Sequence, residues 1–297
     1  MNSKTVSWFL FFFMLSMSSV YTMDAPPLSN DMTVMLRLII YNHHAQINNK
    51  LAQCTRDDLN KWYTMRRDDL EAWHPECTSW PLVIQALNDN QRYTQVNPLC
   101  FAAFAHNYYA IQRLRQRGAQ LLDYALHYAL RNPTSGPLTQ RKTVCTLCGY
   151  LIQQNPHALR AVDQTQRTAL DIAAEVQDTM VVELLLDRGA PMDNVQPLVA
   201  AAVRGRLMTC ALLLQRGMNI DARTSTGSTV LYDAVGDGKD LSAARLAGIK
   251  WLLEHGAQSQ VSMAGCDGNT PLQRLRNSPH AGELYQELIE LLRSKNP

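Results

Sequence analysis

The sequence lacks a strong charge of either sign. It carries 28 Lys and Arg residues against 26 Asp and Glu residues, a formal net charge of +2. Nucleic-acid binding is typical of a denser basic patch with aromatic platforms, so no nucleic-acid partner is predicted. Basic residues do gather in 97–160, where seven stand against Asp123 alone. Such a local field could steer an acidic protein partner, or it could be an ordinary solvated face.

Motifs that carry enzyme chemistry are also absent. The sequence contains no Gly-x-Ser-x-Gly, no His-Glu-x-x-His and no Gly-rich loop followed by Lys-Ser or Lys-Thr. The segment 236–240 lacks the alternating oxygen ligands and the final Glu of a calcium loop, so we interpret it as an inserted turn. The sequence therefore predicts no catalytic residue and no cofactor.

The seven cysteines leave two chemical alternatives open. Cys145-x-x-Cys148 would form a redox pair if its first thiol were exposed at a helix N-terminus. The same motif is only half of a zinc site, and Cys54, His74 and Cys77 lack regular spacing and a fourth ligand, so no metal is predicted. In an exported chain a Cys54–Cys77 disulfide is the alternative for these residues.

Residues 1–23 differ from all that follow. Lys4 is the only charge before Asp24, and the stretch 6–15 is nearly all apolar. A short basic region followed by an apolar run is typical of an export signal. The 19 uncharged residues 5–23 could instead be an uncleaved membrane anchor or an ordinary buried segment. Under either of the first two interpretations Lys4 stays inside, and residues 24–297 are exported to the periplasm, the cell surface or the medium.

One internal offset recurs along the chain and indicates stacked repeats. A leucine is followed by two alanines three and four residues later, and by a glycine nineteen residues later. The small pair lets a neighbouring helix approach, and the glycine suits the left-handed end of a second helix. In one unit Thr168 can cap the first helix. The three sets are Leu99, Ala102, Ala103 and Gly118; Leu170, Ala173, Ala174 and Gly189; Leu198, Ala201, Ala202 and Gly217.

These units resemble the ankyrin repeat, whose pattern runs Gly-x-Thr-Pro-Leu-His-x-Ala-Ala and later Leu-Leu-x-x-Gly-Ala. Residues 268–272 (Gly-Asn-Thr-Pro-Leu) and 227–231 match the first half, and 185–190 and 252–257 match the second. The His after the leucine is absent throughout. The resemblance implies an all-α solenoid of helix–turn–helix units with short hairpin loops, which is not an enzyme. The positions of the missing His hold Cys100, Asp171, Val199, Tyr232 and Gln273.

The repeat frame predicts six units in a domain over 97–295, namely 97–120, 121–160, 161–193, 194–220, 221–258 and 265–295. Asn155 replaces the terminal glycine of the second unit as a left-handed residue. Cys148 takes the position of Val182 and Cys210 in their units. Because that position is apolar core, we interpret Cys148 as a small buried residue rather than a redox thiol.

Residues 24–96 show no clean repeat. Amphipathic patterns predict helices over 31–51 and 57–73. The end of a solenoid exposes an apolar face, so we interpret this region as a helical cap, with an independent functional module as the alternative.

The resemblance implies that a protein partner binds the concave side, which hairpin tips and first helices build. The residue two after each key leucine should face this side, and the tips should add further contacts. We expect a monomeric, non-enzymatic exported protein, which fits a bacterium; a thiol-dependent enzyme or an envelope-anchored structural protein are the alternatives. The first-helix candidates are Phe101, Ile172, Ala200, Asp233 and Arg274, and the tip candidates are Gln166, Arg223, Ser225, Ser228 and Asn269.

Overall fold

The computed structural model describes residues 35–36, 39, 44–61, 63–66, 93–120, 123–132, 138–163, 165–176, 178–224, 226–238, 241–277 and 282–295. Contacts divide the chain into two compact units. The N-terminal unit holds residues 1–102 and 107–120, and the C-terminal unit holds residues 103–106 and 121–297. The candidate export signal at 1–23 lies outside the described residues.

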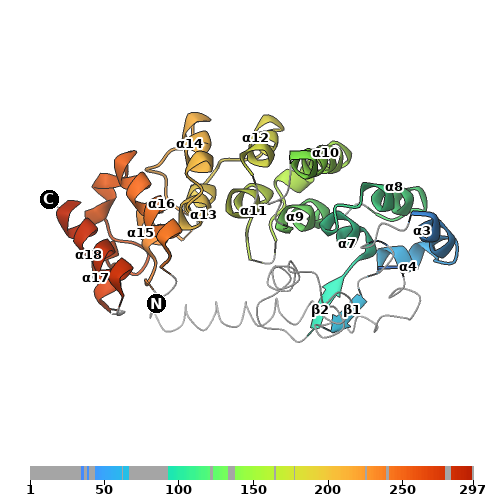
Figure 1. Ribbon diagram of the computed structural model, residues 1–297, viewed down its shortest axis with the longest axis horizontal. Helices are drawn as coiled ribbons and strands as arrows, with labels where there is room; N and C mark the ends of the chain where they lie inside the picture. Colours follow the sequence, from blue (N-terminus) through green and yellow to red (C-terminus); the bar gives the residue numbers. More distant parts are fainter. Residues whose placement is uncertain are drawn as a thin grey trace, which may run out of the picture. The chain divides into compact units, whose positions relative to one another are not determined.

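Six helix pairs follow one another along the described part of the chain, one in each predicted repeat (Figure 1). The all-α helix–turn–helix architecture is therefore confirmed. The pairs are α7 (Pro98–Phe104) with α8 (Tyr108–Gln116), α9 (Tyr124–Arg131) with α10 (Leu138–Gln154), α11 (Ala169–Val176) with α12 (Thr179–Asp187), α13 (Gln196–Val203) with α14 (Leu207–Gln215), α15 (Val230–Val235) with α16 (Ala243–Glu254), and α17 (Pro271–Asn277) with α18 (Glu283–Lys295).

Among the elements whose bounds the structure describes, the N-terminal unit adds two further helices and a small sheet. They are α3 (His44–Leu51), α4 (Arg56–Asn60), and the strands β1 (Tyr63–Arg66) and β2 (Tyr93–Val96), which pair antiparallel. The buried side chain of Asn107 accepts a hydrogen bond from the Ala110 N–H at the start of α8 and donates to the Ile39 carbonyl at 2.8 Å. This unit therefore has its own interior of helix contacts.

The prediction of one continuous helix over 57–73 is wrong in its described part, where the helix ends at Asn60; residues 67–73 lie outside the described residues. Thr55 and Asp58 form a capping box that begins α4 at Arg56, but the chain is already extended at Lys61. The next residues, Tyr-Thr-Met-Arg, join the sheet instead. Aromatic and β-branched side chains favour strands, and pairing with residues thirty positions away outweighs the local helical pattern.

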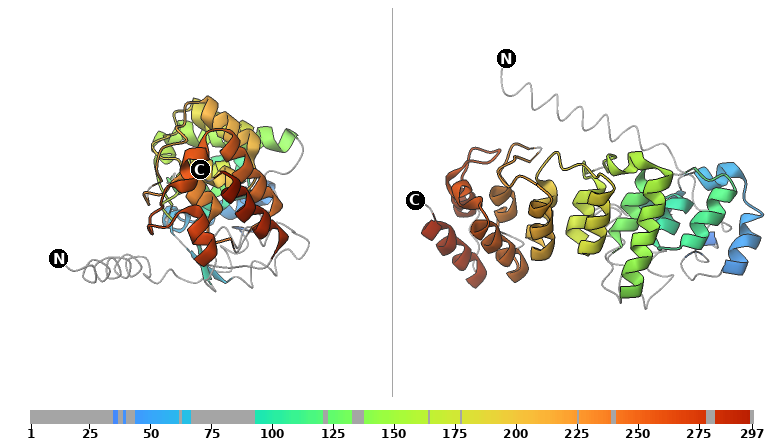
Figure 2. Two further views of the ribbon diagram at one scale, coloured as in Figure 1. Left: turned by 90° about the vertical axis from the view of Figure 1, so that its left-hand side faces the viewer. Right: turned by 90° about the horizontal axis from the view of Figure 1, so that it is seen from above.

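In the C-terminal unit the first helices pack in one row and the second helices α10, α12 and α14 in another (Figures 1 and 2). The predicted alanine pairs make this spacing possible: Ala173, Ala174, Ala201 and Ala202 are all fully buried. Gly248 of α16 shows how close the helices come. A Cβ built there would overlap the carbonyl oxygen of Ala202 in α13.

The glycines after the second helices end them as predicted. Gly189 has φ 80° and donates to the Leu186 carbonyl at 3.0 Å, while Ala190 donates to Leu185 at 2.9 Å. This pair of bonds is the Schellman motif. The prediction for Asn155 is wrong, because its φ is −145°. Asn155 precedes Pro156, which disfavours helical conformations in the residue before it, and a 3₁₀ helix (η1, Pro156–Leu159) follows. A second one, η2 (Ala257–Ser262), follows α16.

Candidate protein-binding surface

Three hairpin tips of the C-terminal unit share one hydrogen-bonding pattern. The N–H of the first residue donates to the carbonyl of the fifth, and the N–H of the fourth donates to the carbonyl of the first. The N···O distances are 2.9 and 2.9 Å in 163–167, 2.9 and 2.8 Å in 224–228, and 2.9 and 3.1 Å in 265–269. We call these segments the tip turns. The repeat pattern in the sequence predicted hairpin tips at these positions. Because two backbone hydrogen bonds close each turn, its backbone conformation is fixed.

The fourth residue of each tip turn has a positive φ. Gly227 and Gly268 take φ values of 82° and 79° there, whereas Gln166 is held at 60°. A side chain in this conformation costs about 1–2 kcal/mol. The side chain of Gln166 is exposed, so this strained position presents a polar group to solvent.

Each tip turn leads directly into a capped first helix. Thr168, Thr229 and Thr270 follow the turns, and each hydroxyl accepts the N–H of the residue three positions on at 3.2–3.3 Å. Asp171 and Gln273 return a bond to the threonine N–H at 2.7 and 2.8 Å. A tip turn and its helix are therefore joined on both sides of the cap, which fixes the tip relative to the helix.

The fourth unit lacks a tip turn in the described residues. Before α13, the N–H of Gln196 instead bonds to the side chain of Asn194 at 2.8 Å. The key leucines Leu170 and Leu198 are 28 residues apart, whereas Leu198 and Leu231 are 33 apart. The difference is the length of one tip turn.

Several first helices of the C-terminal unit expose part of one face. The residue two positions after the key leucine is partly exposed in four units. The residue five positions after it is partly or fully exposed in four units as well. This spacing is that of one helix face. We call the set the first-helix row: Tyr128, Arg131, Glu175, Ala200, Val203, Asp233, Arg274 and Asn277.

Three predicted contact residues are buried, and their prediction as exposed contacts is wrong. Phe101 is 3% exposed and Ile172 is 0% exposed. Ile172 is covered because residues 169–174 of α11 are all buried between neighbouring helices. Ser228 is also 0% exposed, and its hydroxyl accepts the N–H of Cys266 at 3.1 Å, which links two tip turns. Ser225 lies outside the described residues.

The other candidates are accessible, and their partner role stays a prediction. Gln166 and Arg223 are exposed, whereas Ala200 and Asn269 are partly exposed. The Arg223 guanidinium folds back to the Gly227 carbonyl at 2.7 Å, so it lies on the tip turn itself.

Arg274 lies over a buried aromatic ring and interacts electrostatically with Asp233. The Arg274 guanidinium stands 4.6 Å from the ring centroid of Tyr232, which is fully buried and whose pKa burial raises to about 12. Burial also raises the pKa of Asp233, although the hydroxyls of Thr224 and Ser228 favour its ionised form. The fifth and sixth units thus present a stacked cation next to a half-buried carboxylate.

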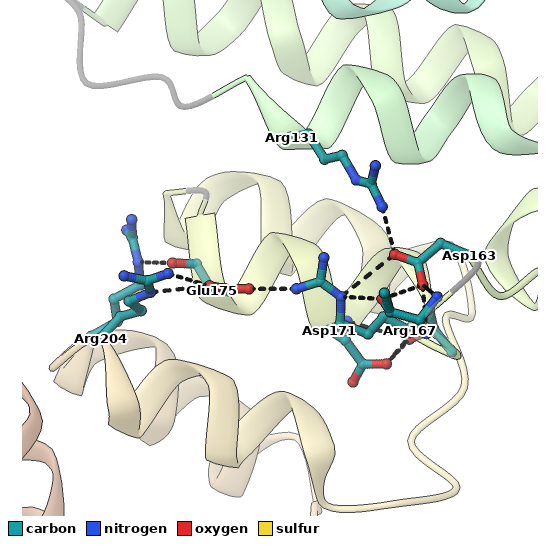
Figure 3. A network of polar contacts seen from close by, with 9 residues as sticks. Arg131, Asp163, Arg167, Asp171, Glu175 and Arg204 are labelled. Atoms are coloured by element: carbon teal, nitrogen blue, oxygen red, sulfur yellow. Dashed lines mark hydrogen bonds and ion pairs between the residues drawn. The ribbon is translucent and has the colours of Figure 1, made fainter. Parts of the chain in front are cut away.

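A network of ion pairs connects the second, third and fourth units (Figure 3). Arg131 of α9 reaches Asp163 of the first tip turn at 2.7 Å, and Arg167 lies 3.5 Å from the same carboxylate. Arg167 also pairs with Glu175 at the end of α11 at 2.7 Å. The same Glu175 carboxylate also pairs with Arg204, which lies just after α13, with Nη2 of Arg204 2.5 Å from Oε1 of Glu175.

Asp163 is the buried anchor of this network. Burial would raise its pKa, but hydrogen bonds from Thr165, from the Arg167 N–H and from Arg131 hold the pKa below its ordinary value. Asp171 lies nearby without a direct arginine bond, and burial raises its pKa.

Sequence reasoning missed Glu175, Arg131 and Arg204. Arg131 and Glu175 stand five residues after their key leucines, one helical turn beyond the predicted position. The same period of 3.6 residues that predicted the second position would have indicated the fifth as well. Arg204 comes one residue after the fifth position of its unit. Its pairing with Glu175, 29 residues earlier in the sequence, is not indicated by any local sequence pattern.

The Cys145-x-x-Cys148 pair lies inside α10 rather than at its N-terminus. Cys148 is fully buried, as predicted, and burial raises the pKa of its thiol. Burial, with a smaller contribution from Asp178, also raises the pKa of Cys145. Neither thiol is therefore activated for redox chemistry.

The described segments hold neither a cluster of metal ligands nor a membrane-spanning helix. No three His, Cys, Asp or Glu side chains gather there as a set of metal ligands. Among the helices in that part of the chain, none combines the length and the apolar character that crossing a bilayer requires.

Comparisons with known proteins agree with this architecture. The ankyrin-repeat family model matches residues 165–197, which run from the first tip turn through α11 and α12 into α13. The chain contains an ankyrin repeat at these residues. The chain is similar to the B-cell lymphoma 3 protein homolog of Mus musculus, at 32% identity, and to the B-cell lymphoma 3 protein of Homo sapiens, at 34%. Each match spans 134 residues, 43% of this chain and 26% of the relative.

A solved structure of an ankyrin repeat domain from Acinetobacter baumannii AYE also aligns with this chain. The alignment has a TM-score of 0.45 and 24% identity, and it covers 67% of this chain and 97% of that one. Ankyrin repeats mediate binding to other proteins. The match spans about a quarter of the length of the curated relatives.

Proposed function

We propose that this protein is exported and binds another protein through its tip turns and first-helix row, without catalysing a reaction. The tip turns carry the proposal. Each is closed by two backbone hydrogen bonds and joined to a capped helix, so a partner meets contacts that are already ordered. Such a surface binds with little loss of conformational entropy.

The state of the thiols favours a binding role over the thiol-enzyme alternative. Cys148 is fully buried, and burial raises the pKa of both Cys145 and Cys148. A nucleophilic or redox cysteine needs the opposite shift.

Export rests on the sequence of residues 1–23, with its single Lys4 and its apolar run. N-terminal sequencing of the protein recovered from each cell fraction tests this part. An exported protein shortened near residue 23 supports a cleaved signal, and an exported full-length chain supports the anchor. Recovery from the cytoplasm alone contradicts export.

Capture of the partner is followed by a binding measurement with a matched control. The tagged full-length chain is cross-linked in the cells that produce it, and the captured partner is then purified for calorimetry. The test variant is R223A/R274A, which leaves Asp233 in place because its carboxylate supports a tip turn. The control variant is R188A/R293A, which removes the same charge from exposed second-helix positions.

We expect the test variant to weaken binding about tenfold or more, which corresponds to about 1.4 kcal/mol, and the control to retain affinity. Equal effects of the two variants, or no effect of either, would contradict the assignment of this surface.

A further inference from the structure

Two guanidinium groups bond to the carboxylate of Glu175, and a third bonds to its backbone. Arg204 donates to this carboxylate from Nη2 at 2.5 Å and from Nε at 3.1 Å, and Arg167 donates from Nη1 at 2.7 Å. Arg206 bonds to the backbone carbonyl of Glu175 at 2.6 Å and to that of Val176 at 2.8 Å. Arg167 also lies 3.5 Å from Asp163, which pairs with Arg131, so three guanidinium groups share the two carboxylates of Asp163 and Glu175.

The second-helix side has the reverse arrangement. Arg216, after α14, lies between two carboxylates, with Glu183 at 2.9 Å and Asp187 at 2.6 Å. Here one guanidinium serves two acids, and the local surplus is negative. Both clusters join the third and fourth units. The local surplus of charge is positive on the first-helix row and negative on the second-helix side.

The cationic cluster is open to solvent at one end. The Arg204 side chain is 60% exposed, and those of Arg167 and Glu175 are 33% and 20% exposed. The Nη1 group of Arg204 makes no hydrogen bond to the residues that the structure describes. A guanidinium presents its donors in a planar fork that fits a carboxylate, so a second carboxylate can reach Arg204 without displacing the helix.

We propose that Arg204 and Arg167 bind an Asp or Glu carboxylate of the protein partner, and that Glu175 is an internal competitor for this site. The inference rests on the proposed function, because it names the chemistry that a partner brings to the first-helix row. Glu175 holds the two arginines in position and keeps the site partly neutral in the free protein. The partner carboxylate either binds the arginines together with Glu175 or replaces Glu175 on them.

Two variants of one ion pair separate this role from a structural one. R204A and E175Q both break the Arg204–Glu175 pair, so a purely structural contact predicts that both weaken binding. A competitor predicts opposite effects, because E175Q removes the rival charge while keeping the shape of the side chain. R204K preserves the charge but loses the fork, and R216A is the matched control from the anionic cluster.

The probe is a set of peptides selected from a random displayed library on the immobilised full-length chain. We expect enrichment in Asp and Glu, about tenfold weaker binding to R204A, partial recovery in R204K, tighter binding to E175Q and no change in R216A. Thermal unfolding of each variant verifies that it is folded. Because exposed pairs contribute about 0–1 kcal/mol, the midpoints should remain close to that of the parent.

Several results would overturn the inference. These are selected peptides without acidic enrichment, equal weakening by R204A and E175Q, or an equal effect of R216A. Peptides that respond to R223A/R274A but not to R204A would leave the proposed function standing and remove only the acidic site. Failure to select any peptide, together with failure of the capture experiment, would contradict both.

Discussion

Replacing Gly248 by alanine tests how closely the helices of the fourth and fifth units pack. The added Cβ would overlap the Ala202 carbonyl oxygen and lie 2.7 Å from its carbonyl carbon. Both atoms belong to the backbone of α13, so α16 itself must move. Overpacking of this kind costs about 1–3 kcal/mol. Alanine recovers about 0.5–1 kcal/mol in a helix interior, which leaves an expected net loss of about 1 kcal/mol.

Gly149 offers the matched control because it also lies inside a second helix. A Cβ there meets nothing closer than the Arg188 guanidinium at 3.5 Å, which is ordinary contact. G149A should therefore stabilise the protein by about 0.5–1 kcal/mol.

Thermal unfolding followed by circular dichroism measures both effects. For a unit of this size 1 kcal/mol shifts the midpoint by about 2–4 °C, so G248A should unfold about 2–4 °C lower and G149A slightly higher. Equal or higher stability of G248A would refute the close approach of α16 to α13.

Three further outcomes follow from buried or strained groups. Burial lowers the pKa of His127 below its ordinary 6.5. Just below pH 6.5 the imidazole is therefore protonated in the unfolded chain but stays neutral in the folded protein. The midpoint should fall as the pH drops below about 6.5, and H127Q should reduce that slope in a pH series of melts. Cys148, fully buried, should resist a thiol reagent until denaturant is added, and rapid native labelling would contradict its burial. Q166G should raise stability by up to about 1 kcal/mol, because φ is 60° there; a denaturant titration that shows a loss would mean that the Gln166 side chain supports the turn.

Much of the repeat architecture could be predicted because its signals are local. The glycine after a second helix, the threonine before a first helix and the alanine pair each act within a few residues. Gly189, Thr168 and the pair Ala173-Ala174 accordingly have the roles that the sequence predicted.

The errors occurred where distant residues decide the structure. Residues 63–66 form a strand rather than the predicted helix because they pair with the strand at 93–96. The periodic frame located Ile172 on the first helix, but neighbouring helices cover it, while Asp233 at the same position remains partly exposed. Side-chain pairing between Arg204 and Glu175 depends on stacking of whole units, which a single sequence does not encode as a pattern.

The absence of a tip turn in the fourth unit has a consequence for the partner. It leaves the turn at 163–167 by itself, whereas the turns at 224–228 and 265–269 are joined by the bond from Cys266 to Ser228. A partner that engages all three must bring two separate contact segments to the surface. The second segment then binds at the effective concentration set by the first, so the complex gains avidity. A fragment of the partner that retains one segment would dissociate far faster than the intact molecule.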